Sequence, residues 1–575
     1  MITRYYQEEL ARLKELGAEF AEKHPALAPM LGGPSADPDV ERLLEGTAFQ
    51  TALLRRKLDD DFPELIHDMV RLVAPHYLRP VPATTIVAFE PKSSLAQSRT
   101  IPAGTELASV PVEGTRCLFR TTSPVELHPL ELTKATFTQP AGKAPAITLS
   151  LTLRDITLAD WRPHSLRLFC AGEFTQSTEL FLILSRHLKQ IILVPEEGGT
   201  PTILPSSCLQ PAGFTGNEPL IPWPPHAFPG FRLLQEYFVA PHRFLFLELT
   251  GWERWASRGD GSRFTVSFEL EGLRIPTHVT RDSFALFATP AVNLFSRDAE
   301  PILLDHRRER YLIRPEGMPP EHAQVHSVDR VTGFNRGTNT TRDYAPFEQF
   351  TEPTGSRPVY HTSASPSPFR PGVDVHLAVS RARGEAPAEN ETLSIRLTCT
   401  DASLPQALRI GDLCVPTGST PACARFRNIL PVSAPLLPPL GKNRLWRLLS
   451  HLSASHLPLA GAPNLRKTLS LYLFDGQDQA TLAANQRRIE GIEELAAQPV
   501  DRLIGGAPVR GEDVRLSIRR DHFAGPGDLF LFCSVLDEFI RSCTMINSFT
   551  RLTVRETMRG EEYRWPARIG QKPLI

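Results

Sequence analysis

Residues 75–89, with the sequence PHYLRPVPATTIVAF, separate a helical part of the chain from a part rich in strands. Pro75 is predicted to end the last helix, because proline lacks the amide hydrogen that a helix interior needs. After the proline-rich link at residues 79–82, residues 85–89 carry the β-branched and aromatic side chains typical of a strand. We therefore expect helices before residue 82 and mainly strands beyond it.

The part before this link shows the spacing of amphipathic helices. Apolar residues recur three and four apart, which places them on one face of a helix. Two such stripes run through Tyr6, Leu10, Leu13, Leu43, Leu44 and Leu54. Asp37-Pro38 is typical of a helix start, and residues 61–64, DFPE, predict the start of a third helix. Phe49, Leu53 and Ile66 lie off the stripes, so their apolar surface is expected to contact either the rest of the chain or a partner.

Beyond residue 83, short β runs are broken by proline and glycine. Residues 264–270, FTVSFEL, alternate strictly, so one face of this strand is expected to be buried and the other to meet water. Helices are expected near residues 178–187, 231–238, 445–457 and 465–474. Residues 335–372 have no hydrophobic period and are expected to form a long surface arm.

The fold class expected from these patterns is α+β with several domains. An N-terminal helical segment is followed by β-rich domains and a C-terminal α+β domain, because residues 514–518 alternate as a strand and a helix follows Asp528. The expected parts are residues 1–82 (helical), 83–334 (β-rich, two subdomains), 335–389 (irregular arm, one strand and a linker) and 390–575 (α+β).

Charge and composition exclude several classes of function. The chain has 63 basic and 64 acidic residues, so it lacks the positive excess that non-specific nucleic-acid binding requires. Its longest uncharged stretch, residues 198–217, is rich in Pro, Ser, Thr and Gly, which argues against membrane insertion. The N-terminus is charged and no CxxC pair occurs among the eight cysteines, so we expect a cytoplasmic protein with reduced thiols.

The search for catalytic motifs is negative. GxSxG, HExxH, GxxxxGK[ST] and GxGxxG are absent from the sequence. His322 and His326 have the spacing of zinc ligands on a helix, but Val325 and Val328 predict a strand there. We therefore expect no enzyme, no cofactor and no metal. The alternative left open is a β-rich hydrolase acting on carbohydrate, with two carboxylates brought together in a cleft.

Ordered sequence blocks along the whole chain resemble the TssF family (also called VasA or ImpG) of type VI secretion baseplate subunits. The matching blocks include residues 37–46 (DPDVERLLEG), 75–80 (PHYLRP), 292–295 (VNLF), 445–452 (LWRLLSHL), 523–528 (FAGPGD) and 546–549 (INSF). Two positions depart from the family pattern. Residues 287–290, FATP, replace a segment that often carries a Cys, and Asp401-Ala402 replaces a typical Asn-Arg.

This resemblance implies a structural subunit of a phage-tail-like baseplate without catalysis. Two copies of such a chain are expected to join one TssG chain, with TssK and the sheath-linking TssE completing a wedge around the spike. That baseplate nucleates the contractile sheath and tube, and it would lie in the cytoplasm, docked at the inner-membrane complex. A structural protein of a contractile phage-tail-like particle is the closest alternative.

The resemblance also suggests where partners bind. We expect a helical bundle with TssG to use Tyr6, Leu10, Leu13, Leu43, Leu44 and Leu54. In the C-terminal part, Arg515 and Arg519 lie on an arginine-rich strand and are expected to pair with acidic partners.

Overall fold

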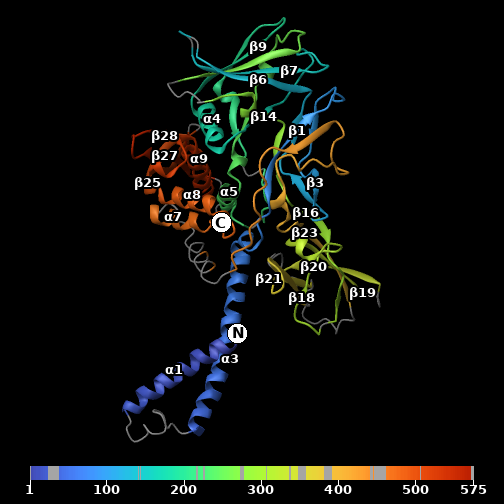
Figure 1. Cartoon of the computed structure of the whole chain (residues 1–575). Coiled ribbons are helices and arrows are strands. Elements are labelled where there is room, and N and C mark those ends of the chain that lie inside the picture. Colours follow the sequence, from blue (N-terminus) through green and yellow to red (C-terminus); the bar gives the residue numbers. More distant parts are fainter. Residues whose placement is uncertain are drawn as a thin grey trace.

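The computed structural model shows a long helical arm that extends from a larger body built mainly of β sheets (Figure 1). This arrangement confirms the α+β multidomain class. The structure describes residues 2–23, 38–139, 141–142, 144–214, 218–224, 227–271, 278–305, 307–335, 339–347, 358–380, 391–440, 445, 448, 461–504 and 507–570, with only the backbone described at residues 2–5, 8, 21–22, 55–65, 504 and 507.

The arm consists of α1 (Ile2–Lys23) and α3 (Pro38–Val73). Helix α3 begins at Pro38 and ends before Pro75, as predicted, and its 36 residues span about 54 Å. The predicted start of a third helix at residues 61–64 is wrong, because the backbone remains helical through Pro63. A proline in a helix interior costs about 3 kcal/mol. The main-chain hydrogen bonds of the helix on both sides of Pro63 outweigh this local cost.

The first sheet of the body joins strands from distant parts of the sequence. Its order is β24-β1-β15-β4-β3. These strands are β1 (Thr84–Pro91), β3 (Glu106–Val112), β4 (Thr115–Thr121), β15 (Ala288–Val292) and β24 (Ala424–Asn428). The central strand β1 pairs with β15 on one side and with β24 on the other. Residues on both sides of the predicted arm therefore belong to one sheet.

The upper part of the body contains two further sheets, in the orders β10-β9-β13-β7-β6 and β11-β12-β8-β14. Their strands are β6 (Leu130–Thr138), β7 (Ala146–Leu153), β8 (Leu166–Cys170), β9 (Leu188–Pro195), β10 (Thr202–Pro205), β11 (Leu209–Ala212), β12 (Phe246–Leu249), β13 (Arg263–Leu270) and β14 (Phe284–Leu286). The alternation predicted for residues 264–270 is confirmed, since Phe264, Val266 and Phe268 are buried. The helices predicted near residues 178–187 and 231–238 are α4 (Phe174–Arg186) and α5 (Pro229–Val239). Strands β2 (Arg99–Ile101) and β5 (Val125–Leu127) form a separate two-stranded antiparallel sheet.

The sheet beside the base of the arm has the order β16-β23-β19-β20-β21-β22-β18. Its strands are β16 (Phe295–Asp298), β17 (Ile302–Leu304), β18 (Tyr311–Leu312), β19 (Gln324–Asn335), β20 (Thr340–Pro346), β21 (Val359–Pro366), β22 (Val373–Ser380) and β23 (Glu391–Thr400). The prediction of an irregular arm over residues 335–372 is therefore wrong where the chain is described. Strand β21 carries mostly half-buried side chains on both faces, so no hydrophobic alternation marks it, and it is held by main-chain pairing with β22.

The domain boundaries predicted at residues 335 and 390 fall inside this same sheet. Strand β19 lies before the first boundary and β23 after the second, yet the two pair along most of their length. Residues 348–357 and 381–390, which include most of the predicted linker, lie outside the described residues. Pairing between strands far apart in sequence explains why composition alone misplaced these boundaries.

Residues 462–569 form an α+β unit, which we call the C-terminal domain. Its sheet has the order β25-β26-β27-β28, with β29 also pairing with β27. The elements are α7 (Ala462–Ser470), α8 (Gln479–Glu490), β25 (Ile492–Ile504), β26 (Ala507–Ile518), α9 (Pro526–Cys543), β27 (Phe549–Glu556), β28 (Glu562–Arg564) and β29 (Arg568–Ile569). Most of the helix predicted at residues 445–457 lies outside the described residues.

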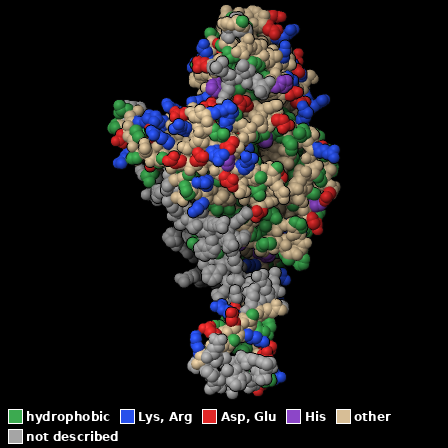
Figure 2. Space-filling view, turned by 60° about the vertical axis from the view of Figure 1, so that its left-hand side comes forward, with side chains coloured by type: hydrophobic (Ala, Val, Ile, Leu, Met, Phe, Trp, Pro, Cys, Tyr) green, Lys and Arg blue, Asp and Glu red, His purple; other side chains and the backbone are tan. Residues whose placement is uncertain are grey.

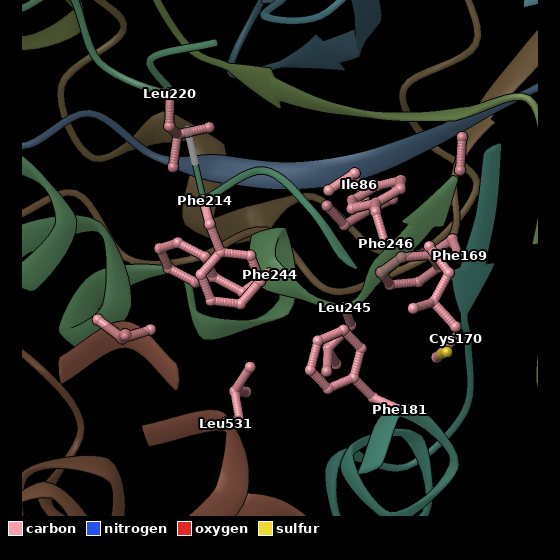
Figure 3. Packing of buried hydrophobic residues seen from close by; sticks show 14 of the residues in the cluster. Ile86, Phe169, Cys170, Phe181, Phe214, Leu220, Phe244, Leu245, Phe246 and Leu531 are labelled. Atoms are coloured by element: carbon pink, nitrogen blue, oxygen red, sulfur yellow. The ribbon is translucent and has the colours of Figure 1, made fainter. Parts of the chain in front are cut away.

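One hydrophobic core runs through the upper body and the C-terminal domain (Figure 3). Phe181 of α4 lies at its centre, with ring centroids 6.2 Å from both Phe214 and Phe530. Helix α9 of the C-terminal domain thereby packs against α4 and α5 of the upper body. A separate core fills the sheet beside the arm. The arm projects away from these cores except at its base, where Ile66 and Val70 of α3 belong to the first core.

Candidate assembly surface

Helix α1 packs against the N-terminal part of α3. Ala48 and Ala52 of α3 are fully buried, and Lys14 Nζ lies 2.8 Å from the Glu41 carboxylate. Four of the predicted contact residues are half-buried in the arm: Tyr6, Leu10, Leu13 and Leu44. We interpret these four residues as holding the two helices of the arm together.

The outer face of α3 carries a stripe of exposed leucines. Leu43 is 71% exposed, Leu54 is 65% exposed and Leu72 is 37% exposed. Their spacings of 11 and 18 residues are close to whole numbers of helical turns, so the three side chains share one face. We call these three residues the leucine stripe. It lies on the side of α3 away from Ala48 and Ala52.

Other large apolar side chains of the arm are exposed as well: Leu16, Phe20, Phe49, Leu53, Met69 and Val73. Isolated exposed hydrophobic residues are ordinary on a protein surface, whereas a row along one element marks an interaction surface. The body offers a contrast, since Figure 2 shows basic and acidic side chains intermingled over its visible face. The arm is therefore the candidate assembly surface.

The base of the arm is fixed rigidly to the body. After α3, the 3-10 helix η1 (Pro75–Leu78) is fully buried. Tyr77 Oη donates a hydrogen bond of 2.7 Å to the Leu471 carbonyl, and the ring centroids of His76 and Trp223 lie 4.1 Å apart. The joint between His76 and Trp223 was not predicted. Residues 75–80 stood out only as one of the blocks that match the TssF pattern.

The two arginines predicted to meet acidic partners are not equivalent. Both Arg515 and Arg519 are exposed at β26 or its end. Arg519 already donates hydrogen bonds of 3.1 and 2.6 Å to Asp521. A partner would compete with this pair for Arg519, so Arg515 is the better placed of the two.

A cavity of about 830 Å³ between β1, β6, β14 and β24 lacks the arrangement of a glycosidase site. Its carboxylates each pair with an arginine: Glu90 with Arg427, Glu131 with Arg154 and Asp282 with Arg281. A glycosidase needs one carboxyl group that holds a proton in an apolar setting. The described lining of this cavity offers no such group.

His322 and His326, which the sequence analysis judged poor zinc ligands, have different partners. His322 precedes β19 and its Nδ1 lies 2.9 Å from Thr115 Oγ1, whereas His326 lies within β19 and its Nδ1 lies 2.9 Å from the Pro80 carbonyl oxygen. In the part of the chain that the structure describes, no three metal-binding side chains come together. Among the described helices, none combines the length and hydropathy needed to cross a membrane.

Asp401, one of the positions that departs from the family pattern, joins two sheets. Its Oδ2 accepts hydrogen bonds from the Leu118 amide at 2.8 Å and from Asn293 Nδ2 at 2.6 Å. Its own amide donates to Asn293 Oδ1 at 2.8 Å. Burial raises the pKa of Asp401 to about 6, against the hydrogen bonds that favour its ionised form. This carboxyl group is structural, since all of these contacts are with residues of the fold.

A family model described as "Type VI secretion system, TssF" matches residues 1–572. The chain belongs to the TssF family. The resemblance found in the sequence is thereby confirmed. This TssF-family chain is 31% identical to the type VI secretion system component TssF1 of Pseudomonas aeruginosa, and the alignment covers 99% of each chain.

Two solved structures share the fold of this TssF-family chain. A chain of the type VI secretion TssK–TssF–TssG baseplate subcomplex, seen by cryo-electron microscopy, is 30% identical with a TM-score of 0.80. The match covers 93% of this chain and 99% of that chain. A chain of a type VI secretion baseplate complex is 25% identical with a TM-score of 0.63, and the match covers both chains completely.

Proposed function

We propose that this TssF-family chain is a structural subunit of a type VI secretion baseplate, that it has no catalytic activity, and that it assembles with TssG and TssK. The observation that carries the role of the arm is the leucine stripe, which is exposed on the side of α3 away from Ala48 and Ala52. Support for the partners comes from the similar chain in the TssK–TssF–TssG subcomplex. The family match favours a secretion system over a contractile phage particle.

In this proposal the arm forms a helical bundle with TssG. Burying one leucine side chain contributes about 2 kcal/mol, so Leu43 and Leu54 together supply a large part of a stable contact. Tyr6, Leu10, Leu13 and Leu44 support the bundle by holding α1 against α3. Two copies of the chain join one TssG, and TssE and the spike contact the body in the complete wedge. The wedge lies in the cytoplasm, docked at the inner-membrane complex, and Arg515 faces an acidic partner.

The double variant Leu43→Asp/Leu54→Asp tests the arm. Two carboxylates in an apolar contact remove its burial energy and add a desolvation cost, so we expect the affinity for co-expressed TssG to fall by at least about 100-fold. Light-scattering mass of the purified complex gives the number of copies, and circular dichroism of the chain alone checks that it is folded.

Arg42→Asp is the matched control. It places a carboxylate at an exposed position about 100° around the helix from Leu43, without touching the leucine stripe. We expect this variant to bind TssG like the wild type. A folded Leu43→Asp/Leu54→Asp chain that still forms the complex would contradict the proposed role of the arm.

A further inference from the structure

A pocket of about 520 Å³ lies at the base of the arm, where α3 and η1 meet β19, β21 and the loop at residues 222–224. Figure 1 shows β21 beside the point where α3 enters the body, and the two elements are in contact through Arg71 and His361. The pocket has no part in the arm contact proposed for TssG.

The pocket is a gap in the sheet between β19 and β21. Strand β20 pairs with β19 only at residues 331–335, and it pairs with β21 only at Val359 and Tyr360. Within the described ranges, residues 324–330 pair on one side only, with β23, and residues 361–366 on one side only, with β22. Two strand edges therefore flank the pocket, and each can pair with an extended segment.

The pocket lining carries more positive than negative charge. Arg71, Arg79 and Arg120 line it, and Asp329 is the acidic residue in its described lining. Asp329 accepts hydrogen bonds from Ser327 Oγ at 2.8 Å and from Thr398 Oγ1 at 2.7 Å. Arg71 already pairs with the Asp68 carboxylate at 3.2 Å, so the charge available to an anion is chiefly that of Arg120.

Arg120 is the cation most in need of an anion. Burial lowers the pKa of its guanidinium, although Asp329 and Glu106 at longer range oppose this shift. In the described part of the chain, no carboxylate lies within the 4.0 Å of a salt bridge to Arg120. A hydrogen bond to a charged group contributes more than one between neutral groups, particularly where water is excluded.

His326 adds a second, independent requirement. Its side chain is 5% exposed, and its Nδ1 lies 2.9 Å from the Pro80 carbonyl oxygen. A carbonyl only accepts, so Nδ1 carries the hydrogen, and Nε2 of the neutral ring is an acceptor. Burial, and then the charge of Arg79, lowers the pKa of His326 to about 3, so the ring is neutral at physiological pH. Among the described residues, Nε2 has no hydrogen-bond partner.

A ligand that satisfied both groups would supply a negative charge for Arg120 and a hydrogen-bond donor for His326 Nε2. A fully ionised inorganic anion offers acceptors only, which suits Arg120 but not His326 Nε2. An acidic peptide offers both, since its backbone amides donate and its side-chain carboxylates accept. Its extended backbone also fits the edges of β19 and β21.

We propose that this pocket receives an extended acidic segment of the partner that binds the arm. The pocket and the leucine stripe meet at the same end of α3, because Arg71 lines the pocket and Leu72, about 100° around the helix, is the next residue. A partner that covers the stripe at Leu72 thus has the pocket beside it on the same helix. This inference rests on the proposed function, in which the arm is the assembly surface.

Two variants of the full-length chain test the pocket by their affinity for TssG. Arg120→Gln removes the unpaired charge, and we expect the affinity to fall about tenfold. Thr362→Glu places a carboxylate in the pocket lining, where it competes with the acidic segment and also weakens binding. The matched controls are Arg116→Gln, exposed on the same strand as Arg120, and Ser296→Glu, exposed on β16 of the same sheet, which β23 separates from β19. Both controls should bind like the wild type.

A photo-crosslinking residue at position 363 identifies what enters the pocket, because Ser363 also lines it. The expected product is a crosslink to an acidic segment of TssG. Wild-type affinity of both pocket variants, with no partner crosslink, would show that water alone fills the pocket and would overturn the inference. The arm proposal would survive that result if Leu43→Asp/Leu54→Asp still abolished assembly, so the two failures are distinguishable.

Discussion

At the scale of single residues, Asp401 shows how a buried carboxyl group makes the joint between two sheets depend on pH. An aspartate in the unfolded chain ionises near pH 4, whereas the folded site has a pKa of about 6. The folded state therefore holds the proton more tightly, and its stability falls as the pH rises from about 4 to about 6. The difference corresponds to about 3 kcal/mol at pH 7.

Asp401→Asn should remove this dependence. An asparagine oxygen in place of Oδ2 still accepts from the Leu118 amide and from Asn293, while no charge is buried. We expect the variant to unfold at a higher temperature than the wild type at pH 7.5 and at a similar temperature at pH 4. Differential scanning fluorimetry at both values measures this. An equal difference between the two proteins at both pH values would contradict a titrating carboxyl group.

The same pair marks a limit of reading the sequence. The block at residues 292–295 and the departure at Asp401 both stood out, yet nothing in the sequence joined them. Asn293 and Asp401 are 108 residues apart, and their contact depends on how two sheets pack. The leucine stripe was easier, since Leu43 and Leu54 lie on one helix. Their exposure, in contrast to the half-burial of Leu44, became clear only once α1 was placed.

At the scale of elements, local periodicity predicted where helices and strands occur but not how far they continue. Residues 61–64 look like a helix start, yet α3 runs through them as one helix. Strands β20 and β21 went unpredicted because their half-buried polar side chains show no alternation. In both cases the outcome depends on neighbours outside the local window, namely the continuing helix and the adjacent strand.

Continuity of α3 gives a direct prediction for Pro63→Ala. Proline at an interior position lacks one main-chain hydrogen bond, and its replacement by alanine in a helix is worth up to about 3 kcal/mol. We expect slower amide hydrogen exchange in residues 55–70 of the variant and a stronger helical signal in circular dichroism. Pro75→Ala, at the end of the helix, serves as a control and should leave exchange in residues 55–65 unchanged. Unaltered exchange in Pro63→Ala would show that the helix is interrupted there.

At the scale of the whole molecule, the buried joint at the base of the arm sets the direction in which the arm leaves the body. The first core includes Ala74, Tyr77 and Val81 of this joint, and Arg71 of α3 contacts β21 of the sheet that holds the second core. Val81 and Leu436 exchange main-chain hydrogen bonds of 2.8 and 2.9 Å, which tie the link after η1 to the loop before the C-terminal domain. A partner bound along the arm is therefore held in a defined position relative to both cores.

A second contact, between α3 and β21, also holds the arm against the body, and we call it the brace. Arg71 Nη1 of α3 lies 3.0 Å from His361 Nε2 of β21 and 3.2 Å from the Asp68 carboxylate. Arg71→Ala removes this brace while Ile66 and Val70 remain buried in the core. Because the brace contributes about 1–2 kcal/mol, its loss should widen the range of arm orientations without unfolding the joint.

Spin labels measure this range as a distance distribution between the arm and the body. Arg12 on α1 and Glu253 on the body are exposed positions for labelled cysteines, in a background where the exposed Cys414 is replaced by serine. We expect Arg71→Ala to broaden the distribution, and Lys23→Ala, which removes an exposed pair with Glu19 inside the arm, to leave it unchanged. TssG bound to the leucine stripe should narrow it again, since a partner that reaches the pocket beside Arg71 replaces the lost brace. A distribution equally narrow in all variants would mean that the buried joint alone fixes the arm.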